Sequence, residues 1–186
     1  MHALLTLVIR VALTATALLV VTLVFFVEPV LVSDDAGTRT LVLLDRGRKT
    51  RVGDSVFCTL NTATPLRGRV AGVAGQRVSL KENLLFIDGE PVERRPCGGG
   101  ETQGLSAAQA SRCFRERRGD RSWRVVAPPD RTQVALDVRV PPGSLYVLSD
   151  DRAGHLPDSR SRGPVQRGSC RSVAAEWARG TFQLRP

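Results

Sequence analysis

Residues 140–165 read VPPGSLYVLSDDRAGHLPDSRSRGPV. The run Ser144–Leu148 is apolar and contains residues that favour extended backbone, so it predicts a strand. The segment Asp150–Gly163 that follows is polar, with Asp and Arg residues close together. We therefore expect a strand that leads into a polar loop.

The rest of the chain after residue 33 has the same character, with short apolar runs separated by turn residues and no long helical period. Asp88-Gly89 is a good hairpin turn because Gly accepts positive φ. The predicted strands are Thr40–Leu44, Ser55–Leu60, Arg69–Val73, Arg77–Leu80, Leu84–Ile87, Ser122–Ala127, Gln133–Val140 and Ser144–Leu148, with a last apolar stretch at Val173–Trp177. One short helix is predicted at Gly104–Cys113, and the fold class is mostly β.

The first 27 residues differ from this body, because they contain one Arg and no acidic residue. The run Val11–Val27 has no charge, Pro or Gly and would rise roughly 25 Å as a helix. Residues Ala3–Ile9 extend it if Arg10 reaches the lipid headgroups. We predict an N-terminal transmembrane helix at about residues 3–27.

A cleavable signal peptide is the competing interpretation of this segment. It requires a basic start and a small-x-small site after the apolar core, but Glu28-Pro29-Val30-Leu31 follows here. We therefore expect an uncleaved, single-pass anchor. Arg10 weakly favours a cytoplasmic N-terminus, which would place the body outside the cytoplasm.

The formal net charge of +9 suits a surface that faces anionic lipid headgroups. Nucleic acid is not an expected partner, because the Arg residues are scattered, aromatic residues make up 5% and no nucleic-acid-binding motif occurs.

Four cysteines stand at positions 58, 97, 113 and 170 without a CxxC pair, and neither histidine is near them in sequence. We expect no metal site and no cofactor. In an oxidising compartment an even number of cysteines permits disulfides. The first candidate pair is Cys97 with Cys113, which closes a Gly-rich loop, and Cys58 with Cys170 is then left.

The opening segment resembles the motif "VPxGxxFxxGDNRxxSxDSRxxGxV" of bacterial type I signal peptidases, the membrane-anchored Ser/Lys endopeptidases of family S26. Asp150 and Arg152 match its first half, and Asp158-Ser159-Arg160 match its second half. Ser149 replaces a Gly, Asp151 replaces an Asn, and one residue is inserted between the halves. A solvent-exposed acidic loop without function would explain single matches to the motif, but not a set of matches in the same order.

Two further segments are similar to motifs of the same family. Residues 69–78, which include Arg69, Gly72 and Gly75, resemble "KRVxGxPGDxV", and residues 84–92 resemble "LxxNGxPV". Residues 26–41 resemble "FVxxFxIPSxSMxPTL", and residues 113–125 resemble the linking strand pair of the family. The resemblance covers residues 11–178 except 93–112.

The resemblance implies an anchor (1–32), a β core (33–92 and 121–186) and a small inserted subdomain that is partly loop (93–120). It also implies a protein of the bacterial inner membrane with its body on the extracytoplasmic side. The expected partners are the membrane, signal peptides or preproteins, or an active signal peptidase.

The catalytic positions of the family do not carry catalytic residues here. The nucleophilic Ser falls on Ala36, or on Asp45 when the count runs backwards from Gly53-Asp54, and neither alignment finds a serine. The base Lys falls on Gly68, and the Ser that helps bind the oxyanion falls on Asp34. An anion at that last position would repel the oxyanion. Loss of a nucleophile and its base costs on the order of a million-fold in rate.

Three functions remain open. The first is a catalytically degenerate signal peptidase-like protein that binds peptide or an active peptidase. The second is an active peptidase with a relocated Ser/Lys or Ser/His dyad, for which Ser33, Lys49 and His155 are the substitutes. The third is an exported structural or interaction protein with a basic, lipid-facing surface.

Overall fold

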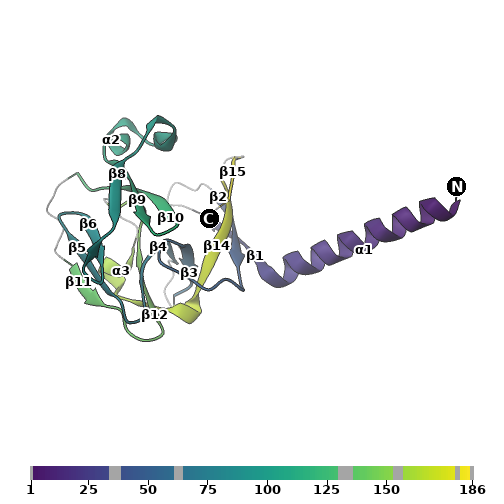
Figure 1. Ribbon diagram of the computed structural model, residues 1–186, viewed down its shortest axis with the longest axis horizontal. Helices are drawn as coiled ribbons and strands as arrows, with labels where there is room; N and C mark the ends of the chain where they lie inside the picture. Colours follow the sequence, from purple (N-terminus) through teal and green to yellow (C-terminus); the bar gives the residue numbers. More distant parts are fainter. Residues whose placement is uncertain are drawn as a thin grey trace. The chain divides into compact units, whose positions relative to one another are not determined.

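The computed structural model describes residues 2–33, 39–60, 65–129, 136–152, 157–178 and 181–184. The chain divides into two compact units, residues 1–48 with 173–185 and residues 49–172 with 186. Figure 1 shows the elements of both units. The predicted domain boundaries stay a prediction.

The first unit contains helix α1 (His2–Phe26) and two pairs of antiparallel strands. Strand β1 (Val27–Ser33) pairs with β2 (Arg39–Asp45), from Val27 opposite Asp45 to Ser33 opposite Arg39. Strand β14 (Cys170–Ala178) begins in the second unit, and its later residues pair with β15 (Thr181–Leu184). In the described part of the chain, no helix is both long and apolar enough to cross a membrane, so the predicted single span is not supported.

The second unit holds the main sheet, in the order β14-β3-β4-β12-β13, with antiparallel neighbours. Its further strands are β3 (Ser55–Cys58), β4 (Leu66–Val73), β12 (Ser144–Leu148) and β13 (Val165–Gln166). The register between β12 and β4 shifts between Tyr146 and Val147, which marks a bulge. Among the described strands of this main sheet, only β12 begins and ends at the predicted residues.

Two smaller antiparallel sheets complete this unit. One has the order β11-β5-β6-β7 and consists of β5 (Arg77–Lys81), β6 (Leu84–Ile87), β7 (Glu90–Pro91) and β11 (Leu136–Arg139). The other, called here the insertion sheet, has the order β10-β9-β8 and consists of β8 (Glu93–Pro96), β9 (Cys113–Arg118) and β10 (Arg121–Val126). The predicted turn is present, because both Asp88 and Gly89 have positive φ (55° and 85°). The body is therefore mostly antiparallel β, as the sequence predicts.

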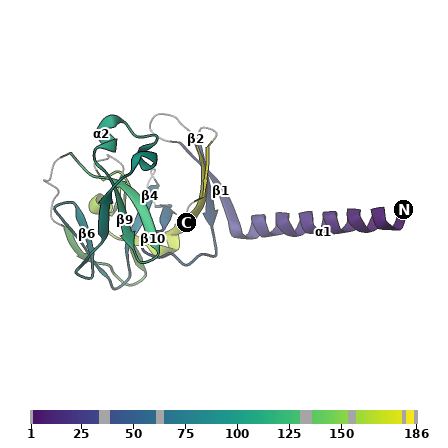
Figure 2. The same cartoon turned by 45° about the horizontal axis from the view of Figure 1, so that its top comes forward.

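Four short helices lie between the strands in the described part of the chain. They are η1 (Gly99–Thr102), α2 (Ala107–Ala110), α3 (Ser159–Arg162) and η2 (Arg167–Ser169). The predicted helix at 104–113 is confirmed only over one turn, which begins where the Ser106 side chain accepts a hydrogen bond from the Gln109 backbone N–H. Both η1 and α2 lie in the connection between β8 and β9, beside the insertion sheet (Figure 2).

The core of the second unit consists of two clusters of buried side chains. One lies among β5, β6, β10 and β12 and includes Leu85, Trp123 and Tyr146. The other lies on β3, β4, β12 and β13 and includes Val56 and Leu145. Both cysteine pairs are confirmed as disulfides, Cys58–Cys170 in the second cluster and Cys97–Cys113 at the end of the insertion sheet.

Candidate functional site

Gly68, to which the sequence resemblance assigns the lysine base, lies in strand β4 and pairs with Val56 of β3. A Cβ atom at Gly68 would lie 2.5 Å from the Leu148 carbonyl oxygen and 2.9 Å from the Val147 Cγ1 atom. Backbone cannot move aside as a flexible side chain can. The packing therefore has no room for any side chain at position 68.

The next residue of β4, Arg69, binds the loop that follows β12. Its Nε and Nη2 atoms donate to the two carboxylate oxygens of Asp150 at 2.8 and 2.9 Å, and its Nη1 donates to the Gly53 carbonyl at 2.7 Å. The guanidinium also lies 5.9 Å from the ring centre of Trp123. A planar guanidinium suits this two-pronged contact, so Arg69 fixes β4, the Gly53 turn and Asp150 relative to one another.

Arg152 performs a similar task toward the insertion sheet. Its Nη1 and Nη2 atoms donate to the carboxylate of Glu116 at 2.8 and 2.6 Å, and the Trp123 indole N–H donates to the same carboxylate at 3.0 Å. Glu116 was not a predicted site residue, because the run CFRERR reads as an exposed charged strand. The alternation of side chains along a strand gives one indication that Glu116 is buried, since Glu116 lies on the same face as the apolar Phe114.

The second half of the loop is organised by Asp158, whose side chain is 2% exposed. It accepts hydrogen bonds from the backbone N–H of Ser149 at 3.0 Å and of Arg160 at 2.9 Å, and it caps α3. Ser159 Oγ accepts the Val147 N–H at 2.9 Å, and Arg160 Nη1 donates to the Arg152 carbonyl at 2.8 Å. These bonds tie α3 to the end of β12.

The structure also explains why two positions of the second motif are occupied by glycine. A Cβ at Gly72 would lie 2.3 Å from the Val78 Cγ2 atom, so β4 and β5 approach closely there. Gly75 has a φ of +87°, which favours glycine in the turn before β5.

The buried face beside this network holds Tyr146, whose residue is 1% exposed. Within the described residues, its hydroxyl has no hydrogen-bond partner. Burial raises the pKa of Tyr146 to about 12, and the nearby Asp158 carboxylate adds to the shift. The phenol therefore stays protonated and is no candidate base.

The predicted substitute residues Ser33, Lys49 and His155 stay a prediction. Ser33 is the last residue of β1, opposite Arg39, in the first unit, and Lys49 is exposed in the second unit. Asp34, Ala36 and His155 lie outside the described residues. The described residues also contain no group of three His, Cys, Asp or Glu side chains that could hold a metal ion.

The whole sequence matches one protein family over residues 5–176, and that family is described as signal peptidase, peptidase S26. The chain belongs to the S26 signal peptidase family. Among solved structures, the chain is similar to a signal peptidase I from Enterococcus faecalis V583. The two are 19% identical with a TM-score of 0.42, and the match covers 68% of this chain and 97% of that chain. Among curated protein sequences, none matches the chain.

Family membership gives the arginines and aspartates above a common context. They hold β4, β12, α3 and the insertion sheet together next to Gly68, which carries no titratable group. What the described geometry provides is a rigid β scaffold with an internal ion-pair network.

Proposed function

We propose that this protein is a catalytically inactive signal peptidase-like protein that binds an extended peptide, such as a signal peptide or preprotein, or partners an active signal peptidase. The observation that carries this proposal is the packing at Gly68, where a Cβ would lie 2.5 Å from the Leu148 carbonyl oxygen. A lysine base at this position would require the strand pair to move apart. The packing of β4 against β12 therefore excludes a lysine base at position 68.

The motif residues around Gly68 form a hydrogen-bond network, which supports a role in binding a peptide. Arg69, Asp150, Arg152, Asp158 and Ser159 all have partners in hydrogen bonds of 2.6–3.0 Å. An extended peptide can be held by backbone hydrogen bonds to a strand edge, which needs a fixed strand and no nucleophile.

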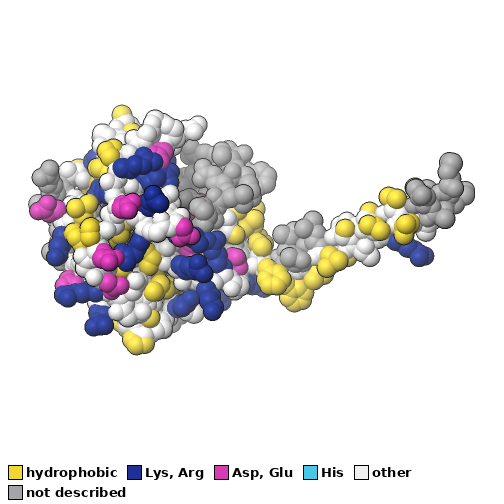
Figure 3. Space-filling model, viewed as in Figure 1, with side chains coloured by type: hydrophobic (Ala, Val, Ile, Leu, Met, Phe, Trp, Pro, Cys, Tyr) yellow, Lys and Arg dark blue, Asp and Glu magenta, His cyan; other side chains and the backbone are white. Residues whose placement is uncertain are grey.

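We also propose that α1 attaches the protein to a membrane, with the second unit in an oxidising compartment outside the cytoplasm. The helix exposes large apolar side chains, among them Leu13 at 65%, Leu18 at 67% and Phe25 at 68% (Figure 3). Apolar surface of this extent needs an apolar partner. All four cysteines are in disulfides, which persist in oxidising compartments.

The activity is tested with the full-length protein in proteoliposomes that also receive a preprotein. No cleavage above an empty-liposome control is expected, while a photo-crosslinker in the preprotein's signal peptide should capture the protein. Cleavage that is abolished by Ser33→Ala, Lys49→Ala or His155→Ala would establish an active, relocated dyad and overturn the proposal.

Failure of capture, with no cleavage, would instead favour an exported structural protein. Membrane attachment is tested separately by alkaline carbonate extraction of cells. The chain should stay in the pellet, and its release into the supernatant would contradict the role of α1.

A further inference from the structure

The insertion sheet presents a charged outer face that the proposed function does not use. The register of β8, β9 and β10 places Arg95, Arg115 and Arg124 in one row across the three strands. The neighbouring row on the same face is Glu93, Arg117 and Ser122. Arg115 is half-buried and the other five residues are exposed.

Three arginines directly opposite one another repel, and like charges in such positions destabilise a sheet. Among the described residues, Glu101 of η1 supplies a counter-charge to this row. Its carboxylate accepts hydrogen bonds from Arg95 Nη1 and Nη2 at 3.0 Å each, from Arg115 Nε, and from the Gly98 N–H at 2.8 Å. This row of guanidinium groups is therefore already arranged to hold a carboxylate.

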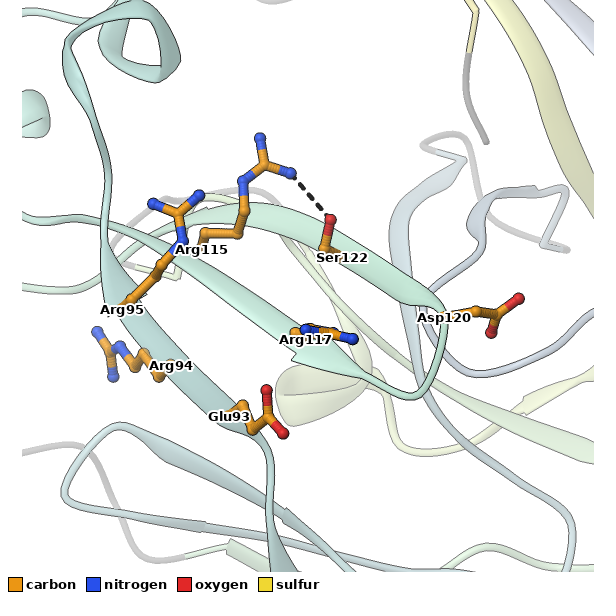
Figure 4. A pocket seen from close by; sticks show the side chains of 7 residues that line it. All are labelled: Glu93, Arg94, Arg95, Arg115, Arg117, Asp120 and Ser122. Atoms are coloured by element: carbon orange, nitrogen blue, oxygen red, sulfur yellow. Dashed lines mark hydrogen bonds between the residues drawn. The ribbon is translucent and has the colours of Figure 1, made fainter.

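Beside the seated carboxylate lies a hollow of about 480 Å³, a size typical of ligand sites. It is lined by Glu93, Arg94, Arg95, Arg115, Arg117, Asp120 and Ser122. Figure 4 shows the Arg115 guanidinium turned toward Ser122, whose Oγ accepts its Nη1 at 3.1 Å. Arg117 lies along β9 between Glu93 and Ser122, and its Nε donates to the Gly119 carbonyl at 3.2 Å.

We propose that this hollow binds an acidic side chain of an extended peptide segment from a partner protein, with Arg117 as the group that contacts the carboxylate. Four arginines and two acidic residues line the hollow, and Glu101 adds a third carboxylate that binds Arg95 and Arg115. The remaining excess of one positive charge favours a ligand with negative charge. Glu93 and Asp120 disfavour a concentrated polyanion such as phosphate, whereas a peptide can place a polar or basic residue beside its carboxylate. The site involves neither Gly68 nor α1, so it can fail independently of the proposed function.

The test uses the full-length protein in detergent and fluorescence anisotropy with two labelled peptides. One is a ten-residue Gly/Ser peptide with two Glu residues and one Lys between them, and the other carries Gln in place of both Glu residues. The Glu peptide should bind at least about tenfold more tightly than the Gln peptide, and added salt should weaken the binding of the Glu peptide.

Arg117→Gln should weaken binding of the Glu peptide about tenfold, because a charge-assisted contact is lost. Arg139→Gln on β11 is the matched control, since it removes another exposed arginine from a different sheet. Both variants should keep the melting temperature of the parent protein. Equal binding of the two peptides, or an unchanged affinity after Arg117→Gln, would overturn the proposal.

Two further ligands separate the peptide from other anions. Inorganic phosphate and vesicles that contain anionic lipid should each compete poorly with the Glu peptide. If either competes efficiently and depends on Arg117 to the same extent, the hollow is a general anion site and the peptide assignment is wrong.

Discussion

Arg152 and Glu116 form a two-pronged ion pair whose side chains are 3% and 1% exposed. The pair joins the motif loop after β12 to strand β9 of the insertion sheet. Because a buried charge without its partner is costly, the two residues depend on each other more than on the solvent.

We predict that Arg152→Met destabilises the protein by about 3–5 kcal/mol, because it removes both guanidinium hydrogen bonds from the buried Glu116 carboxylate and leaves only Arg94, opposite it on β8, as a nearby cation among the described residues. The free energy of unfolding is measured by urea denaturation of the full-length protein in detergent. The double variant Arg152→Met with Glu116→Leu should recover most of the loss. A loss below about 1 kcal/mol in the single variant would show that the pair is unimportant for folding.

The close packing at Gly68 gives a second prediction. Gly68→Ala should cost about 1–3 kcal/mol, because its Cβ overlaps the Leu148 carbonyl oxygen. Gly168→Ala is the control, since a Cβ there meets no atom within 4 Å. The measurement is the difference in unfolding free energy between the two variants, and equal values would contradict the packing argument.

Much of the fold could be predicted from local patterns, because strands with turn residues at both ends carry their own signals. Leu84–Ile87 and Ser144–Leu148 are confirmed with both ends correct. The predicted polar loop at 150–163 contains α3, a single turn that depends on the Asp158 cap and on tertiary contacts with β12. Strand β8 was not predicted, because its sequence ERRP has no apolar residue apart from Pro and is held by pairing with β9.

The candidate site was predictable only in part. The motif residues are visible in the sequence, but the partner of Arg152 is Glu116, which is 36 residues away in a charged run. The lack of space at Gly68 depends on Leu148, which the sequence cannot place beside it. Long-range partners of this kind are set by tertiary packing and leave only weak periodic traces in a sequence.

Tyr146 gives a third prediction. Tyr146→Phe should leave stability unchanged or raise it by about 1 kcal/mol, because it removes a buried hydroxyl that has no hydrogen-bond partner among the described residues. Tyr146→Ala is the contrasting variant and should cost about 3–5 kcal/mol through the cavity it leaves. Thermal unfolding of both variants measures the difference, and a clear loss in Tyr146→Phe would mean that the hydroxyl is bonded.

The insertion sheet should lose stability in acid. The Gly98 N–H and the Arg95 and Arg115 guanidinium groups lower the pKa of Glu101 to about 2. Since this value is below the ordinary pKa of about 4.5, the carboxylate stabilises the fold above pH 4.5 and this contribution is lost as the pH falls toward 2. The protection of residues 97–113 from hydrogen exchange, relative to the intrinsic rate at each pH, should fall over this range, and Glu101→Gln should remove that dependence.

The two disulfides should contribute unequally to stability. Cys58 and Cys170 are 112 residues apart in sequence, while Cys97 and Cys113 are 16 apart. In the chain-entropy account, a crosslink that closes a longer loop restricts the unfolded chain more, which gives about 4–5 kcal/mol for the first pair and about 3 kcal/mol for the second. The double variants Cys58→Ser/Cys170→Ser and Cys97→Ser/Cys113→Ser are compared by urea denaturation under oxidising conditions. The first should be the less stable of the two, and the reverse order would show that packing around Cys97 and Cys113, and not loop closure, sets their contribution.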